Sequence, residues 1–241
     1  MRIIKIILIT LLTITVTNCN TKTKELTKDE QVANYNANER KTALKMIQKG
    51  DLILRLGNDV VSQLLADLNP TDRSYSHCGI VTYINSVPHI YNINPKSSKT
   101  AQDDTIRLER VDSFISNQYN KAFAIYRFNI TPQATDSILQ AIQYYQSLKP
   151  HFDIRFNYAD DSNMYCSELV AKAIRKANIT TINIPNAYME ESKVIGVRRY
   201  FQLMNEQVDL RKYPIITLDN LYLHGNATKV YSAKYKKVTD F

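Results

Sequence analysis

A cysteine at the start of a predicted helix is the residue of this chain best placed for nucleophilic chemistry. Cys166 follows Ser162 and Asn163, which favour a helix cap, so we expect it in the first helical turn. The free N–H groups and positive dipole end found there favour a thiolate. Cys166 also begins an apolar stripe that continues through Leu169 to Ala177, which turns its side chain toward the protein body. A small buried core cysteine is the alternative interpretation.

A nucleophilic cysteine needs a base, and the chain contains only four histidines. His77 begins a predicted strand in which alternation places His77 and Gly79 on one face and Cys78 on the other. Gly79 removes a side chain beside His77, which predicts room for the helix end that carries Cys166. We therefore expect a Cys166–His77 pair, with Cys78 facing away from it. A half-buried strand histidine bonded to a carbonyl is the alternative.

A third polar group should hold the imidazole in one tautomer, and the second strand of a predicted hairpin supplies candidates. A connection with an even number of residues, such as 85–88, places Asn92 and Asn94 on the face of His77. An odd number places His89 there instead. The sequence leaves this register open. Asn92 is the leading candidate, with His89 and Asn94 as alternates.

Two residues near Cys166 have further predicted roles. Tyr165 either shapes the substrate cleft or donates to an oxyanion, with ordinary packing as the alternative, and Gly79 is assigned to the same cleft. Glu168 fits a capping or dipole role in the first helical turn. The expected oxyanion donor is the backbone N–H of Cys166 itself.

The composition excludes several other kinds of site. Three cysteines are too few for a disulfide framework or a four-thiolate zinc site. The five glycines lie too far apart to form a phosphate-binding loop. A metal site built from His77, His89 and Cys78 would need side chains from different faces and has no acidic cluster to complete it. We expect neither a cofactor nor a metal ion.

Residues 1–18 have the pattern of a secretory signal peptide. Arg2 and Lys5 precede an apolar run of about a dozen residues, shorter than the roughly 20 that a membrane span requires. Cys19 follows, and a cysteine at this position resembles the lipid-attachment site of bacterial lipoproteins. We expect an exported protein of the bacterial cell envelope, anchored to the membrane by lipid on Cys19. A plain secretory peptide with an incidental cysteine is the alternative.

Export would remove two of the 31 basic residues and none of the 23 acidic ones, so the formal charge falls from +8 to +6. The remaining basic residues are spread through the chain, and no basic helix or aromatic-spaced stripe indicates a nucleic-acid surface. We expect no nucleic-acid partner. The sequence does not indicate an oligomeric state.

The elements that must position these residues form an α+β pattern. Residues 19–48 are predicted to be a tether and an N-terminal helix, and residues 49–241 a single domain. Strands followed by a late helix indicate an antiparallel sheet. Strands are predicted at 51–56, 77–84, 89–94, 105–110 and 122–128, helices at 30–48, 58–68, 111–117, after Pro132 and around Cys166, and a closing extended segment at 213–219.

Three short motifs mark the first predicted strand and the two halves of the predicted site: GDLI at 50–53, SHCGIV at 76–81 and YCSELV at 165–170. Together they resemble the permuted papain-like hydrolases of the NlpC superfamily, in the YiiX/YebB-like branch. The resemblance covers roughly residues 49–226. It implies a circularly permuted papain-like fold, with a central antiparallel sheet or partial barrel packed by the cysteine-bearing helix.

The same resemblance implies a nucleophile at Cys166, a base at His77 and a third polar residue at Asn92, where relatives commonly carry an acid or a histidine. The expected activity is a cysteine hydrolase that cleaves an amide or ester of a peptide or lipid-like small substrate through a thioester. Acyl transfer would use the same residues with a different acceptor. A non-catalytic, lipid-anchored binding protein is the alternative from another class, and the departure at Asn92 supports it.

Overall fold

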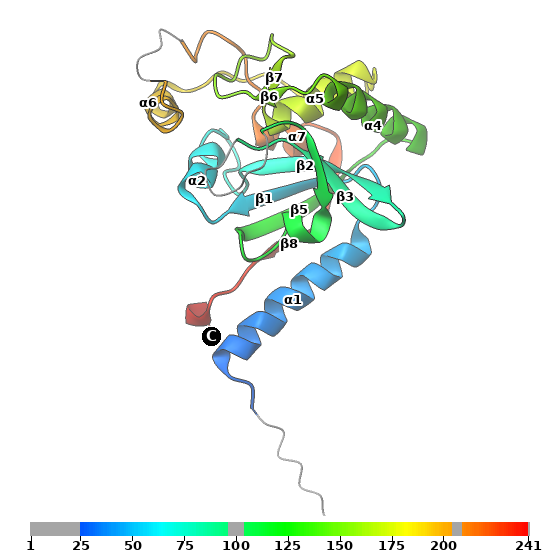
Figure 1. The fold of residues 1–241 in the computed structure, drawn as a ribbon, viewed down its shortest axis with the longest axis vertical. Helices are drawn as coiled ribbons and strands as arrows, with labels where there is room; N and C mark the ends of the chain where they lie inside the picture. The colour runs from blue at the N-terminus through cyan, green and yellow to red at the C-terminus, as the bar shows by residue number, and fades with distance from the viewer. Residues whose placement is uncertain (1–24, 96–103, 204–208, 241) are drawn as a thin grey trace, which may run out of the picture.

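The computed structural model describes residues 25–95, 104–203 and 209–240. The signal peptide and the lipid-attachment site at Cys19 are predictions that lie outside these residues. Six antiparallel strands form the central sheet, and helices cover both of its faces (Figure 1). The predicted α+β class with a central antiparallel sheet is therefore confirmed.

The strands of the sheet lie in the order β4–β3–β2–β1–β5–β8. The first five correspond to the predicted strands, whereas β8, which pairs with β5 at one edge, is not among the predictions. The bounds are β1 Leu52–Gly57, β2 His77–Ile84, β3 Val87–Asn92, β4 Arg107–Arg110, β5 Asn120–Phe128 and β8 Ala227–Lys234, with a separate parallel pair β6 His151–Phe152 and β7 Asn163–Met164.

Five of the helices follow the predicted pattern, but α6 and α7 do not appear in it. The segment 213–219 was expected to be extended throughout, which is wrong because α7 begins at Leu218. No helix in the described ranges is both long enough and apolar enough to cross a membrane. The bounds are α1 Lys28–Met46, α2 Val60–Ala66, α3 Val111–Phe114, α4 Pro132–Ser147, α5 Cys166–Lys176, α6 Glu191–Tyr200, α7 Leu218–Leu223 and the 3-10 helix η1 Val238–Asp240.

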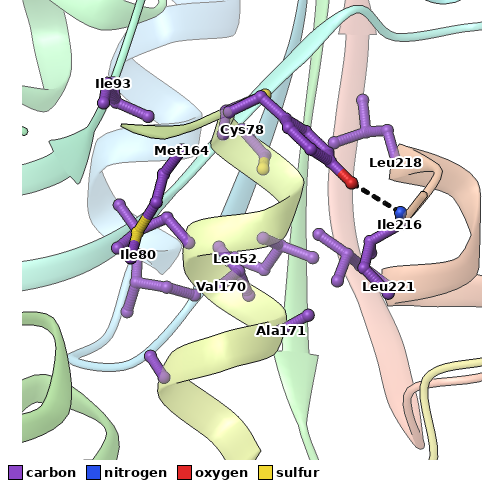
Figure 2. Packing of buried hydrophobic residues seen from close by; sticks show 14 of the residues in the cluster. Leu52, Cys78, Ile80, Ile93, Met164, Val170, Ala171, Ile216, Leu218 and Leu221 are labelled. Atoms are coloured by element: carbon purple, nitrogen blue, oxygen red, sulfur yellow. Dashed lines mark hydrogen bonds between the residues drawn. The ribbon is translucent and has the colours of Figure 1, made fainter. Parts of the chain in front are cut away.

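Side-chain alternation in the central strands divides the core into two layers. Leu52 and Cys78 face the layer that contains α4, α5 and α7, whereas Ile53 and Val81 face the layer that contains α1 and α3. Figure 2 shows the first of these layers around α5. Burying each large aliphatic side chain contributes about 1.5–3 kcal/mol, so these contacts hold α5 firmly on the sheet.

The hairpin between β2 and β3 has a two-residue turn. Asn85 and Ser86 both have positive φ angles, of 48° and 63°, as a type I′ turn requires. Val87 and Pro88, which were predicted to belong to the connection, are instead the first residues of β3. Proline is tolerated there because β4 pairs with β3 only from His89 onward, so Pro88 lies at a local edge.

The first sequence motif has a structural role. Gly50 has a φ of +87°, which favours glycine, and Asp51 follows it immediately before β1. The fully buried Asp51 carboxylate accepts hydrogen bonds from Arg127 Nε and Nη2 at 2.7 and 2.9 Å and from Gln48 N at 2.7 Å. The two bonds with Asp51 raise the pKa of Arg127 and connect the start of β1 to β5.

Candidate active site

Cys166 is the first residue of α5 and is almost fully buried. The prediction of a first-turn position is confirmed, but the predicted cap is wrong, since Asn163 belongs to β7 and Tyr165 is the cap residue. At this helix position the backbone N–H has no partner within the helix, so it is available to an oxyanion. Glu168 has the predicted capping role, because its carboxylate accepts the Tyr165 N–H at 3.2 Å.

His77 and Asn92 meet on one face of the β2–β3 hairpin. Ile80 pairs with Tyr91, and this register places Asn92 and Asn94 on the face of His77, as an even-numbered connection predicts. His77 Nε2 lies 3.3 Å from Asn92 Oδ1, and both residues are buried.

The alternate third residue His89 lies elsewhere. His89 pairs with Thr82, on the opposite face of the hairpin from His77. Its Nδ1 lies 3.0 Å from the carbonyl oxygen of Val87, so the ring is engaged locally. The structure therefore contradicts His89 as the orienting group and leaves Asn92 in contact with His77.

Cys166 lies close enough to His77 and Cys78, at the start of β2, for both residues to shift its pKa. Hydrogen bonding with the Cys78 thiol is the largest cause that holds the pKa of Cys166 well below its usual range. Burial opposes this effect, while the charge and hydrogen bonding of His77 add to it. Burial raises the pKa of Cys78 well above its usual range, so Cys78 stays a neutral thiol and acts as the donor.

The prediction that Cys78 faces away from the site is wrong. Alternation does place Cys78 and His77 on opposite faces of β2, but α5 packs on the face of Cys78. Cys166 is the first residue of α5 and lies beside the start of β2, where its sulfur atom can reach both His77 and Cys78. A helix that approaches the end of a strand contacts both of its faces, which a simple two-face argument does not anticipate.

Gly79 does not clear space for this helix. A Cβ atom at Gly79 would lie 2.3 Å from the carbonyl oxygen of Tyr91 and 2.7 Å from Cγ1 of Ile90. Glycine is therefore required for close approach of β3, and Gly79 is absent from the residues that line the cleft at Cys166. The assignment of Gly79 to the substrate cleft is corrected accordingly.

A small cleft opens beside the Cys166 side chain. Its volume is about 30 Å³, room for one or two water-sized groups. None of the described lining residues carries a charge. They are Leu65, Leu68, Asn69, Ser76, Phe152, Phe156, Tyr165, Cys166, Ser167, Ile215, Ile216, Thr217 and Leu218.

Tyr165 is one of the residues that line this cleft, and its hydroxyl group is already engaged. The hydroxyl oxygen accepts the Ile216 N–H at 2.7 Å, the dashed bond in Figure 2. Ser167 Oγ donates to the Ile216 carbonyl at 2.8 Å. These two bonds fasten the segment 215–218 to the start of α5, and this wall of the cleft was not anticipated because it comes from a distant part of the sequence.

Asn92 is hydrogen-bonded to Glu109 and to Asn94, and Asn94 is hydrogen-bonded to Arg55. The charged residues Arg55 and Glu109 were not singled out from the sequence. Arg55 and His77 are direct partners across β1 and β2, but this pairing depends on the strand register, which alternation along each strand does not supply. In the parts of the chain that the structure describes, no three His, Cys, Asp or Glu side chains are grouped to hold a metal ion.

The sequence model of the family described as permuted papain-like amidases, YaeF/YiiX, C92 family, matches residues 46–196, more than half of the chain. The chain belongs to this family. The amidase is thus a papain-like cysteine hydrolase with a permuted fold, and the resemblance drawn from its three motifs is confirmed.

The amidase also resembles a solved structure, that of the metalloprotein YiiX from Escherichia coli O157:H7. The two share 16% sequence identity, the match covers 78% of this chain and 99% of YiiX, and the TM-score is 0.62. This likeness supports the shared fold. No curated protein matches the chain.

Proposed function

We propose that the amidase cleaves an amide bond through a thioester on Cys166, with His77 as the base and Asn92 as the residue that orients the imidazole. The observation that carries this proposal is the contact of Cys166, at the start of α5, with an imidazole whose Nε2 lies 3.3 Å from Asn92 Oδ1. Nucleophile, base and orienting group are the three parts that papain-like chemistry needs.

The steps follow from the position of each group. His77 takes the thiol proton, and Cys166 Sγ attacks the carbonyl carbon of the amide. The backbone N–H of Cys166 donates to the oxyanion, and the His77 imidazolium then protonates the leaving amine. In the second half-reaction, His77 deprotonates a water molecule that attacks the thioester. The carboxylic acid is released, and the His77 imidazolium returns a proton to the Cys166 thiolate.

The cleft favours a substrate whose acyl part is uncharged and apolar. Its described lining is dominated by aromatic and aliphatic side chains and has no charged group to pair with an ionised substrate. A volume of about 30 Å³ has room for the carbonyl group itself, and the rest of the acyl part would extend from the open side of the cleft.

Hydrolysis is favoured over simple binding by the lowered pKa of Cys166, since a binding cleft has no need of a thiolate. Acyl transfer would use the same first half-reaction with an amine or alcohol in place of water. We further propose that the amidase is exported and acts in the bacterial cell envelope, anchored by lipid on Cys19. Replacing Cys19 with Ser should release the protein from membranes if this lipid is its anchor.

The test compares the wild type with Cys166→Ala and His77→Ala against a panel of peptide amides and acyl amides. Each change should lower kcat by at least roughly 1,000-fold, because the nucleophile and base act as a unit. His151→Ala is the matched control, since His151 is exposed and pairs with Asp104 outside the site. Full turnover by Cys166→Ala would overturn the proposal, and mass analysis of the products separates hydrolysis from transfer.

A further inference from the structure

A chain of hydrogen bonds runs behind His77 through two asparagine side chains. Arg55 Nη2 donates to Asn94 Oδ1 at 3.3 Å, and Asn94 Nδ2 donates to Asn92 Oδ1 at 2.9 Å. Asn92 Nδ2 in turn donates to Glu109 Oε1 at 2.8 Å. The chain begins on β1, ends on β4 and passes through Asn92, the residue that contacts His77.

The two ends of this chain determine its direction. The amide groups of Asn92 and Asn94 could each be turned over, because an amide offers a donor on one side and an acceptor on the other. Arg55, however, can only donate, and the ionised Glu109 carboxylate can only accept. If the Asn92 amide were turned over, its Nδ2 would face Asn94 Nδ2, so that two donors would meet. Its Oδ1 would face Glu109 Oε1, so that two acceptors would meet.

The direction of the chain fixes the tautomer of His77. With Asn92 Oδ1 held toward the ring, His77 Nε2 must carry the proton that forms the contact at 3.3 Å. The neutral imidazole then has its lone pair on Nδ1, which is the nitrogen left for Cys166. A turned amide would present Nδ2 to Nε2 and favour the opposite tautomer, with the lone pair pointing away from the nucleophile.

Both ends of the chain are themselves held in place. The Arg55 guanidinium lies 4.5 Å from the centre of the Phe114 ring and also donates to Asn120 Oδ1 at 3.4 Å. Asn120 cannot turn over either, because its Nδ2 donates to the carbonyls of Phe114 and Ser116. At the other end, Glu109 Oε1 lies 3.7 Å from Arg107 Nε.

We propose that Arg55 and Glu109 are positioning residues that lock the amide of Asn92 and so hold His77 in the tautomer able to take the Cys166 proton. This inference rests on the proposed roles of His77 and Cys166. It explains how an asparagine serves at the third position: the carboxylate of Glu109 holds the Asn92 amide, and the amide in turn contacts His77. The proton of Cys166 passes to His77 Nδ1 and later to the leaving amine, while Nε2 keeps its proton throughout.

The central variants are Glu109→Met, which removes the acceptor, and Glu109→Gln, which retains one. Glu109 is about 30% exposed on a short strand, so both should fold. Two readouts need no substrate: the ¹⁵N chemical shifts of the His77 ring and the pH profile of Cys166 alkylation by iodoacetamide. Glu109→Met should give a mixture of tautomers and slow alkylation at pH 6 by about tenfold. Glu109→Gln should stay within about twofold of the wild type on the same readouts.

A rescue separates positioning from a purely structural role. A carboxylate at position 92 presents an acceptor to His77 Nε2 in either orientation, so it does not need Glu109 to fix its direction. Asn92→Asp combined with Glu109→Met should therefore restore the wild-type alkylation profile. With substrate, Glu109→Met should lower kcat at least about tenfold and leave KM nearly unchanged, as a wrong tautomer does. Asp112→Asn, in an exposed ion pair with Arg110 next to β4, is the control and should change nothing.

Unchanged ¹⁵N shifts and alkylation in Glu109→Met would overturn this inference. Failure of the double variant to recover would overturn it as well, because it would indicate a structural defect. Neither outcome affects the proposed function, which is tested separately by the activities of Cys166→Ala and His77→Ala. Arg55→Met gives a second test from the other end of the chain, and its ¹⁵N shifts should resemble those of Glu109→Met.

Discussion

The Cys78 thiol lies against the Cys166 thiol at the start of β2 and lowers its pKa. Cys78 has no counterpart in a simple Cys–His–Asn scheme, yet it is the largest single cause of the thiolate character of Cys166. A fully buried neutral thiol can donate a hydrogen bond to a thiolate without competing for the proton. The two thiols therefore interact directly, although the sequence suggested separate roles.

Replacing Cys78 with Ala should raise the pKa of Cys166, because the thiolate loses its donor. The rate of iodoacetamide alkylation at pH 6 should fall by about tenfold relative to the wild type. Cys78→Ser retains a donor of similar size and should give a smaller change. An alkylation profile that does not respond to Cys78→Ala would show that the imidazole alone sets the pKa of Cys166.

Tyr165→Phe tests whether the tyrosine hydroxyl stabilises the oxyanion. Because that hydroxyl accepts the Ile216 N–H, we expect kcat to change by less than about threefold. The unpaired N–H should lower the free energy of unfolding by about 1–2 kcal/mol, measured by urea denaturation. A loss of 100-fold or more in kcat, as removal of an oxyanion donor typically causes, would instead assign the hydroxyl to catalysis.

Glu168→Gln should remove a pH dependence of stability. Burial raises the pKa of Glu168 to about 8, despite the ion pair with Lys172 at 2.9 Å. The folded protein therefore binds this proton more tightly than the unfolded chain does. The contribution of Glu168 to the free energy of unfolding is fully present below about pH 4.5, falls as the pH rises to about 8 and is constant above that.

Urea denaturation between pH 5 and 8 measures this effect as the difference between the wild type and Glu168→Gln. Glu30→Gln is the matched control, since Glu30 also caps a helix but is exposed, and Thr27 lowers its pKa. The Glu30 contribution is lost only as the pH falls, so its replacement should leave the slope between pH 6 and 8 unchanged. Equal slopes in the wild type and Glu168→Gln would contradict the raised pKa.

Asp51→Asn should destabilise the amidase because it removes a buried charge that pairs with Arg127 through two hydrogen bonds. We expect a loss of about 2–3 kcal/mol in the free energy of unfolding, since Arg127 remains partly exposed. Asp136→Asn breaks the exposed pair with Lys49 and should cost less than about 0.5 kcal/mol. Equal effects of the two changes would rule out a special role for the buried carboxylate.

The elements with strong periodicity could be predicted from the sequence. The bounds of β2 are those expected from its β-rich run, and α5 follows its apolar stripe. The strand β8 was not predicted because its pattern is mostly polar and half exposed, so pairing with β5 at the sheet edge is what makes it a strand. The helices α6 and α7 are short and have few cap signals, so local sequence says little about them.

The third site residue depended on one number that the sequence leaves open, the length of the β2–β3 turn. Its parity decides whether Asn92 or His89 shares the face of His77, because side chains alternate with a period of two. The positive φ angles of Asn85 and Ser86 settle it as a two-residue turn. An Asn-Ser pair is a weaker turn signal than Asn-Gly, which explains why the connection was expected to be longer.

The sequence by itself determined which residues are available for chemistry and in what order they occur, because residue type, spacing and periodicity are local properties. His77 precedes Cys166, each begins a regular element, and Asn92 belongs to the strand after His77. Only the tertiary structure decided how these groups act on one another. The packing of α5 across the start of β2 brings Cys78 to Cys166. Arg55 and Glu109, on strands distant in sequence, orient Asn92 because hydrogen-bond direction depends on which groups the fold places at the two ends of the chain.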